Sequence, residues 1–425
     1  MNRRDFLKSS GGVALFGTAP GLSGAFETQP TGPTISSVLA PWRPGMLDLH
    51  HINTGRGNAT LAVMPDGTSL LIDAGASGTQ GPAMCPARPD ESGRPGEWIG
   101  RYVQRQLQGA GRTQQDNARL DYALITHLHG DHIGDVTAQS SASQDGKYRL
   151  TGISDVAEVV PVDTLIDRGW PAYDTPVRVS APPALNYIAF VQAEAGRGMR
   201  VERVKVGSSD QIRLRTPERY PEFGVRMLSG NGAVWTGEGA ESRSRFPQNA
   251  IQARDEITAE NGLSIGLRIH YGAFSYFTGG DLNCDTNYGR ETWRDVETPV
   301  AQASGQVSVS TCNHHGYFDA CGPEFVRALR PRVWVLQSWH ASHPALSTLA
   351  NLYSQELYPG PRDVFCLGLH PAAGLACGRF SDQFKSRQGH VLVRVVPGGH
   401  KFQVLVIDDR DESGRVQAVF GPYAS

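Results

Sequence analysis

One short segment constrains this chain more than any other: the turn Thr126-His-Leu-His-Gly-Asp-His132. It continues from Leu120–Thr126, an apolar run that predicts a buried strand. Imidazoles and carboxylates are rarely buried without partners, so three histidines and an aspartate on one turn are not ordinary core residues. Imidazole nitrogen and carboxylate oxygen are the ligands that zinc and similar divalent ions prefer. The segment therefore predicts a metal site at the end of a buried strand.

Strand and helix signals alternate on both sides of this turn. The predicted strands lie around 46–53, 59–64, 69–73, 120–126, 156–166, 201–214, 263–271, 274–278, 307–311, 333–337, 390–396 and 402–407. The predicted helices cover 97–107, 185–194 and 344–356, and another starts near Ile133. Asp66-Gly67 is typical of a hairpin turn, and 230–259 is predicted to be a polar loop. This alternation indicates sheets packed inside and helices outside.

Composition limits the classes of function. The 425 residues carry 40 basic and 42 acidic side chains, a net charge of −2. This balance excludes a protein that binds polyanions through bulk positive charge, although it leaves a local basic cleft open. No apolar run approaches the roughly 20 residues of a membrane span, so we expect no stable membrane insertion. Arg243 and Arg245 could contact phosphate, and a solvated loop is the simpler interpretation of the same pair.

The first twenty-five residues resemble a twin-arginine export signal. The paired arginines are followed by Phe-Leu-Lys, a weakly hydrophobic stretch and a small-residue end; these are Arg3-Arg4, Phe6-Leu7-Lys8, Gly11–Ala19 and Ser23-Gly24-Ala25. A basic N-terminal arm is the alternative. On the first interpretation residues 1–25 are a signal peptide and 26–45 a Pro-rich leader. The export machinery is then a partner, and the mature protein is periplasmic or secreted.

The six cysteines are scattered and include no C-x-x-C pair, so we do not expect cysteine among the metal ligands. An oxidising compartment would permit disulfides. Cys366 and Cys377 could close a loop, but the sequence does not choose between the many pairings.

The H-x-H-x-D-H spacing of residues 127–132 resembles the metallo-β-lactamase superfamily. Further segments, in the same order along the chain, resemble the soluble domain of ComEC-type DNA-uptake proteins: 47–59, 65–75, 260–271, 277–282, 313–316 and 342–344. Together they span nearly the whole mature chain. The resemblance implies a four-layer αββα sandwich of metallo-β-lactamase type. It implies one catalytic domain over 46–410, followed by a C-terminal tail over 411–425.

The resemblance also implies ligands for two divalent metal ions. It assigns His127 and His129 to the first ion, and Asp131 and His132 to the second. Asp281, at the end of a predicted strand, matches the carboxylate that bridges both ions. Zinc is the expected metal, with manganese or magnesium as alternatives.

One histidine of the pair His314-His315 should complete the second site. We favour His314 because it comes directly after a predicted strand, which leaves His315 to face the substrate or to support the ligands. Asp73 matches a carboxylate that orients a ligand histidine. An ordinary aspartate in a turn at the end of a strand would give the same sequence pattern. The expected catalytic residues, which orient the nucleophile or protonate the leaving group, are Asp131, Asp281, His315 and His343.

Two departures from the family pattern weaken the ligand set. Members with a full set carry one more histidine before the bridging aspartate, whereas here the only histidine between His132 and Asp281 is His270, beside a hairpin turn. Asn261, Ser264 or His343 could reach in instead, or the first ion could bind loosely. The second departure is Asn58, where the family has aspartate.

These features predict an exported metal-dependent hydrolase that uses a dinuclear metal-bound hydroxide. The preferred substrates are phosphodiesters, with nucleic acid among the candidates. Carboxylic esters, lactones and phosphocholine esters are the alternative small-molecule substrates. An alternative of another class is an exported binding protein whose incomplete metal site only recognises a ligand, and the missing histidine is its best support.

Overall fold

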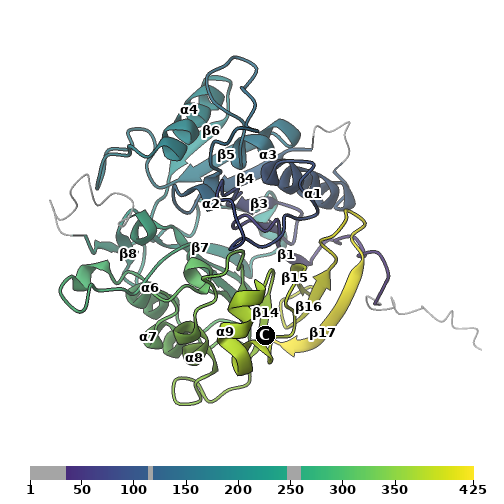
Figure 1. The fold of residues 1–425 in the computed structure, drawn as a ribbon, viewed down its shortest axis with the longest axis vertical. Coiled ribbons are helices and arrows are strands. Elements are labelled where there is room, and N and C mark those ends of the chain that lie inside the picture. The colour runs from purple at the N-terminus through teal and green to yellow at the C-terminus, as the bar shows by residue number, and fades with distance from the viewer. Residues whose placement is uncertain (1–34, 113–117, 247–259) are drawn as a thin grey trace, which may run out of the picture. The chain divides into compact units, whose positions relative to one another are not determined.

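The computed structural model describes residues 35–112, 118–246 and 260–425. The predicted signal peptide, residues 26–34 of the leader and residues 247–259 of the predicted loop lie outside these ranges. Figure 1 shows how the described helices and strands are arranged.

The first sheet has nine strands within the described residues. In spatial order they are β17 (Val416–Ala424), β16 (Lys401–Ile407), β15 (His390–Val395), β1 (Leu47–His51), β2 (Thr60–Val63), β3 (Ser69–Ile72), β4 (Leu120–Leu124), β5 (Val162–Asp167) and β6 (Arg200–Arg203). Its β17-to-β3 half is antiparallel, and β3, β4, β5 and β6 run parallel to one another.

The second sheet has eight described strands. Their spatial order is β14 (Asp363–Cys366), β13 (Val333–Leu336), β12 (Val309–Thr311), β11 (Phe274–Thr278), β10 (Gly266–Tyr271), β7 (Phe223–Gly230), β8 (Ala233–Trp235) and β9 (Ser242–Ser244). The strands β11 to β14 are parallel, and the others pair antiparallel. Each sheet therefore has a parallel part whose strands all end at one edge.

Three hydrophobic clusters define the layers. One lies between the sheets, where the side chains of alternate residues such as Val333 and Val335 meet those of β1 and β15. A second packs the opposite face of the first sheet against α1 (Pro95–Gly109), α3 (Ile153–Val159) and α4 (Pro182–Gly196). The third packs Trp334 and Leu336, on the other face of β13, against α6 (Glu297–Ser304), α7 (Pro323–Leu329) and α8 (Leu346–Tyr353). This helix–sheet–sheet–helix order confirms the predicted four-layer αββα sandwich.

Four sequence predictions about this frame were wrong. The strand predicted around 201–214 is only β6, and the loop predicted over 230–259 contains β8 and β9. The strand predicted around 156–166 is instead the helix α3 followed by β5, because the apolar positions of 153–159 fit both periods. The predicted tail 411–425 contains β17, which pairs with β16 and closes the edge of the first sheet. The structure also contains elements that the sequence did not predict, among them β7, β14, α6, α7 and α9 (Pro371–Ser381).

None of the described helices is both long and apolar enough to cross a membrane. All six cysteines are free thiols, so the loop closure considered for Cys366 and Cys377 is not formed.

Candidate metal centre

The predicted ligands come together where the parallel strands of the two sheets end. The turn 126–132 follows β4 and leads into α2 (Gly130–Ile133). Asp281 follows β11, and His314 and His315 follow β12. Because the carboxyl ends of parallel strands meet at one edge of a sheet, segments far apart in the sequence deliver their side chains to one place.

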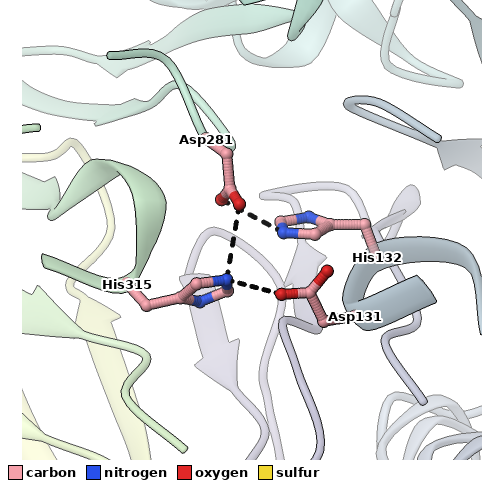
Figure 2. Close-up of side chains that lie close together, drawn as sticks. All are labelled: Asp131, His132, Asp281 and His315. Atoms are coloured by element: carbon pink, nitrogen blue, oxygen red, sulfur yellow. Dashed lines mark hydrogen bonds and ion pairs between the residues drawn. The ribbon is translucent and has the colours of Figure 1, made fainter. Parts of the chain in front are cut away.

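One group of donors consists of Asp131, His132, Asp281 and His315, whose ligand atoms all lie within 4.8 Å of one another. His132 Nε2 is 3.1 Å from Asp281 Oδ1, and His315 Nε2 is 3.4 Å from Asp281 Oδ2. His315 Nε2 also lies 2.8 Å from Asp131 Oδ2. Figure 2 shows the two imidazoles and the two carboxylates pointing toward one another. This set can supply two nitrogen and two oxygen ligands to one ion.

The second group consists of His127, His129 and the same Asp281. His127 Nε2 lies 3.1 Å from His129 Nδ1 and 3.7 Å from Asp281 Oδ2. Among the described residues no further histidine, cysteine, aspartate or glutamate joins this group. Asp281 therefore belongs to both groups, as a carboxylate that bridges two ions would.

The backbone around Asp131 is packed too tightly for side chains. A Cβ atom on Gly75 would lie 1.9 Å from the Asp131 carbonyl oxygen, and one on Gly57 would lie 2.2 Å from it. Asn58 N donates to this same carbonyl at 2.9 Å. The two glycines allow the loops after β1 and β3 to press against the ligand turn and hold Asp131 in place.

The ligand histidines are oriented by neighbouring oxygens. His132 Nδ1 lies 2.7 Å from Asp73 Oδ2, and Asp73 also accepts from the backbone N–H of Thr126 at 2.7 Å. His315 Nδ1 lies 3.0 Å from Asn58 Oδ1. Both contacts leave Nε2 facing Asp281, which is the arrangement that second partners impose on metal-binding histidines. Asp73 thus stands where the sequence predicted, and Asn58 keeps the role of the expected aspartate without its charge.

The carboxylates and histidines of the first group shift one another's pKa values. Burial alone would lower the pKa of His132, but the carboxylates of Asp281, Asp73 and Asp131 outweigh it and raise that pKa well above 6.5. Burial also opposes protonation of His315, whose pKa the carboxylates of Asp281 and Asp131 raise to about 9. The pKa of Asp281 stays well below its usual range despite burial, chiefly because of His132. The site thus favours positive charge at its centre.

Two buried atoms at the centre fit a metal ion better than a hydrogen bond. His132 Nε2 and Asp281 Oδ1 form an ion pair at 3.1 Å, and neither atom makes a hydrogen bond to any described residue. Burying an ion pair without further hydrogen bonds is costly. Nitrogen and oxygen donors that converge in this way are the chemistry that a divalent ion satisfies, so the residues fit the implied metals.

The structure corrects the choice between the paired histidines. His315, not the favoured His314, belongs to the four-donor group. His314 Nε2 lies 3.8 Å from Asp281 Oδ2, and its Nδ1 lies 2.6 Å from Asp319 Oδ1. The reason is the local backbone, which is left-handed at both residues, with φ of 45° and 53°. Counting residues from the end of β12 does not anticipate that conformation.

The candidates for the missing ligand were Asn261, Ser264 and His343, and Asn261 Nδ2 lies 3.4 Å from His314 Nε2. Ser264 Oγ accepts from the backbone N–H of Asp281 at 3.2 Å. His270 is exposed on β10 and covers Gly224. His343 is buried and packs beside His315, with ring centroids 5.0 Å apart, and burial holds its pKa well below 6.5.

A buried ion pair that the sequence did not predict fixes the H-x-H turn. Glu260 Oε1 accepts from the backbone N–H of Leu128, between the two ligand histidines, at 2.9 Å. The same carboxylate binds the guanidinium of Arg168, which is 0% exposed, through both of its oxygens. Glu260 comes after a long polar segment and Arg168 after a strand, so only the tertiary structure shows that they meet.

A pocket of ≈ 180 Å³ opens beside the four-donor group. Its walls are aromatic and polar, and include Asp131, His314, His315, Tyr317, Trp339, His340 and His343. No lysine or arginine is among its lining residues. Arg243 and Arg245 line a different pocket of ≈ 390 Å³, which contains none of the metal donors, so the structure does not support the phosphate contact considered for them.

The αββα sandwich carries two adjacent groups of candidate metal ligands that share one carboxylate, Asp281. Residues 52–154 match the model of the metallo-beta-lactamase superfamily, so this part of the chain is similar to that superfamily. The matched segment contains Asp73 and the whole turn 126–132.

Two solved structures are distantly similar. A candidate metal-dependent hydrolase from Parabacteroides distasonis shares 11% identity with a TM-score of 0.34, over 75% of this chain and 92% of that chain. Zn²⁺-bound PqqB from Methylobacterium extorquens shares 11% identity with a TM-score of 0.33, over 79% and 86%. Similarity this remote carries no information about the site. The curated proteins include no match to this chain.

Proposed function

We propose that this protein is an exported hydrolase that uses two divalent metal ions to cleave phosphodiesters. The observation that carries the proposal is the convergence of six donor residues, from three separate segments of the chain, on a site with Asp281 at its centre. These residues are His127, His129, Asp131, His132, Asp281 and His315. A purely structural role would not explain a buried donor atom such as His129 Nε2, which makes no hydrogen bond to any described residue.

When bound, two ions would supply a nucleophile from water near neutral pH and neutralise charge on the attacked group. The protein's own contribution is to hold the donors rigidly, through Asp73 on His132 and Asn58 on His315. His343 Nδ1 lies 3.4 Å from the backbone N–H of Trp339 and 3.2 Å from Ser338 Oγ; in the tautomer in which Nδ1 accepts from Trp339, a neutral ring carries its proton on Nε2. From the pocket wall, that Nε2–H could donate to an oxygen of the substrate.

The residues that line the pocket limit the kind of substrate that the site can bind. Phosphate is recognised by metal ions or by arginine and lysine, and here the lining residues include neither cation. Charge on the substrate must therefore be met at the metal centre itself. A small phosphodiester with one charged group suits this site better than a nucleic acid, which would need a basic track along its backbone.

The direct test is metal content by elemental analysis, paired with hydrolysis of bis(p-nitrophenyl) phosphate. We expect close to two ions per chain, turnover that a chelator abolishes, and restored turnover on adding zinc or manganese. His129→Ala should lose one ion and turnover while its circular dichroism spectrum stays unchanged. Full turnover by folded His129→Ala would reject the hydrolase, and an absence of turnover by the two-metal protein would redirect the proposal to esters and lactones.

Export is a second part of the proposal, supported by residues 1–25 alone. Twin-arginine export signals depend on their paired arginines. We expect cell fractionation to find the protein outside the cytoplasm, and Arg3→Lys combined with Arg4→Lys to retain it in the cytoplasm. Unchanged fractionation of the double variant would mean that the segment is a basic arm and not an export signal.

A further inference from the structure

The two groups of donors differ in the number of protein ligands that they offer to an ion. Asp131, His132, Asp281 and His315 offer four ligands, whereas the other ion would have only His127, His129 and the shared Asp281. Structural zinc sites use four protein ligands, and catalytic ones commonly use three besides water. Because Asp281 is shared, His127 and His129 are the only ligands that belong to the first ion alone. The first ion therefore has one protein donor fewer than the second among the described residues.

His314 also approaches the carboxylate that the two groups share. Its Nε2 lies 3.8 Å from Asp281 Oδ2, the oxygen that His127 Nε2 approaches at 3.7 Å. His315 approaches the same oxygen at 3.4 Å. Three imidazoles therefore face one carboxylate oxygen, and one of the three belongs to neither group of donors.

The hydrogen bonds of His314 suit a metal ligand. Its Nδ1 lies 2.6 Å from Asp319 Oδ1, so Nδ1 carries the proton that this carboxylate accepts. The Nε2 lone pair of the neutral ring then faces Asp281, and a carboxylate–histidine pair of this kind typically orients a metal-binding imidazole. The other neighbour of Nε2 is Asn261 Nδ2 at 3.4 Å, a weak contact that a ligand could displace.

The backbone is strained in a way that aims both rings at the site. His314 and His315 are both left-handed, with φ of 45° and 53°, which is uncommon for residues other than glycine. Such conformations cluster at functional sites and persist only where their surroundings hold them. Here the buried carboxylate of Glu297 accepts from Asn313 Nδ2 and from the backbone N–H groups of Cys321 and Gly322. The turn is thus anchored on both sides of the paired histidines.

We propose that the paired histidines serve one ion each, with His315 completing the second site and His314 supplying the missing nitrogen of the first. The inference rests on the two-metal site of the proposed function. His314 also lines the pocket beside the four-donor group. The site of the first ion would be the weaker of the two, because its fourth ligand lies at the pocket wall and 19% of that side chain is exposed.

The test is calorimetric titration of Zn²⁺ into protein stripped by a chelator. Wild type should bind two ions in a tight and a weaker step. His314→Ala should weaken the weaker step by at least about 10–100-fold and leave the tight step unchanged, and Asp319→Asn should give a smaller loss of the same step. His315→Ala should remove the tight step. His400→Ala, an exposed histidine away from the donors, is the matched control and should titrate as wild type.

Cobalt substitution gives a second readout, because the visible absorption of bound Co²⁺ reports its ligands. His314→Ala should change the spectrum of the second equivalent only, and His314→Gln serves if the alanine variant does not fold. Two unchanged binding steps and an unchanged spectrum in a folded His314 variant would overturn the assignment while the proposed function stands. Binding of one ion by wild type would overturn both.

Discussion

Replacing Asp281 by asparagine is expected to remove both metal ions and to abolish turnover. Asp281 Oδ1 lies 3.1 Å from His132, and Oδ2 lies 3.4 Å from His315 and 3.7 Å from His127. An amide cannot donate two anionic oxygens, so both groups of donors lose their shared ligand. We expect metal content near zero by elemental analysis and a loss of kcat/KM on the order of 10³-fold or more.

Asp73→Asn is a comparison variant in which we expect a smaller loss of metal affinity than in Asp281→Asn. It leaves all donors in place and weakens only the contact that orients His132. Metal affinity should fall by about 10–100-fold, without loss of both ions at saturating metal. If Asp281→Asn kept two ions, or lost no more affinity than Asp73→Asn, Asp281 would not be the shared ligand.

Replacing Arg168 by methionine is expected to cost about 3–5 kcal/mol in the free energy of unfolding. The guanidinium is 0% exposed and pairs with Glu260, which is 4% exposed. Its removal leaves a buried carboxylate without its cation, and that carboxylate also holds the backbone N–H of Leu128. Urea unfolding followed by circular dichroism measures the change.

The double variant Arg168→Met with Glu260→Met separates the charge from the packing. Burying two apolar side chains of similar size should recover much of the lost stability, because no charge is left unpaired. The same variant should still bind its first ion more weakly than wild type, since the turn between His127 and His129 loses its hydrogen-bond acceptor. A single variant that costs less than about 1 kcal/mol would mean that the ion pair contributes no more than an exposed one.

The success of the sequence interpretation at the ligand turn has a local cause. His127, His129, Asp131 and His132 lie within one turn after an apolar strand, so their proximity is guaranteed by the chain itself. Asp73 and Asp281 were assigned from the family resemblance, and both lie near the ligand turn because each follows a strand whose end meets that of a parallel neighbour. The αββα layering followed from strand and helix signals that could be read at short range, together with the family resemblance.

The wrong predictions of secondary structure concern segments whose conformation depends on contacts with residues distant in the sequence. The helix α3 was read as strand because its apolar residues satisfy either period, and only packing against α1 makes it helical. The tail became β17 because the edge of the first sheet offered unpaired backbone groups to bond with.

By itself, the sequence determined which residues can bind metal, the layered class of the fold and the likeness of its first twenty-five residues to an export signal. The tertiary structure decided which histidine faces which donor. His314 and His315 are adjacent in the chain, and two left-handed residues, anchored through Glu297, turn one ring into the four-donor group and leave the other beside the incomplete one. Only the tertiary structure brought Arg168 and Glu260 together behind the ligand turn, because a buried charge needs a partner in space and not in sequence.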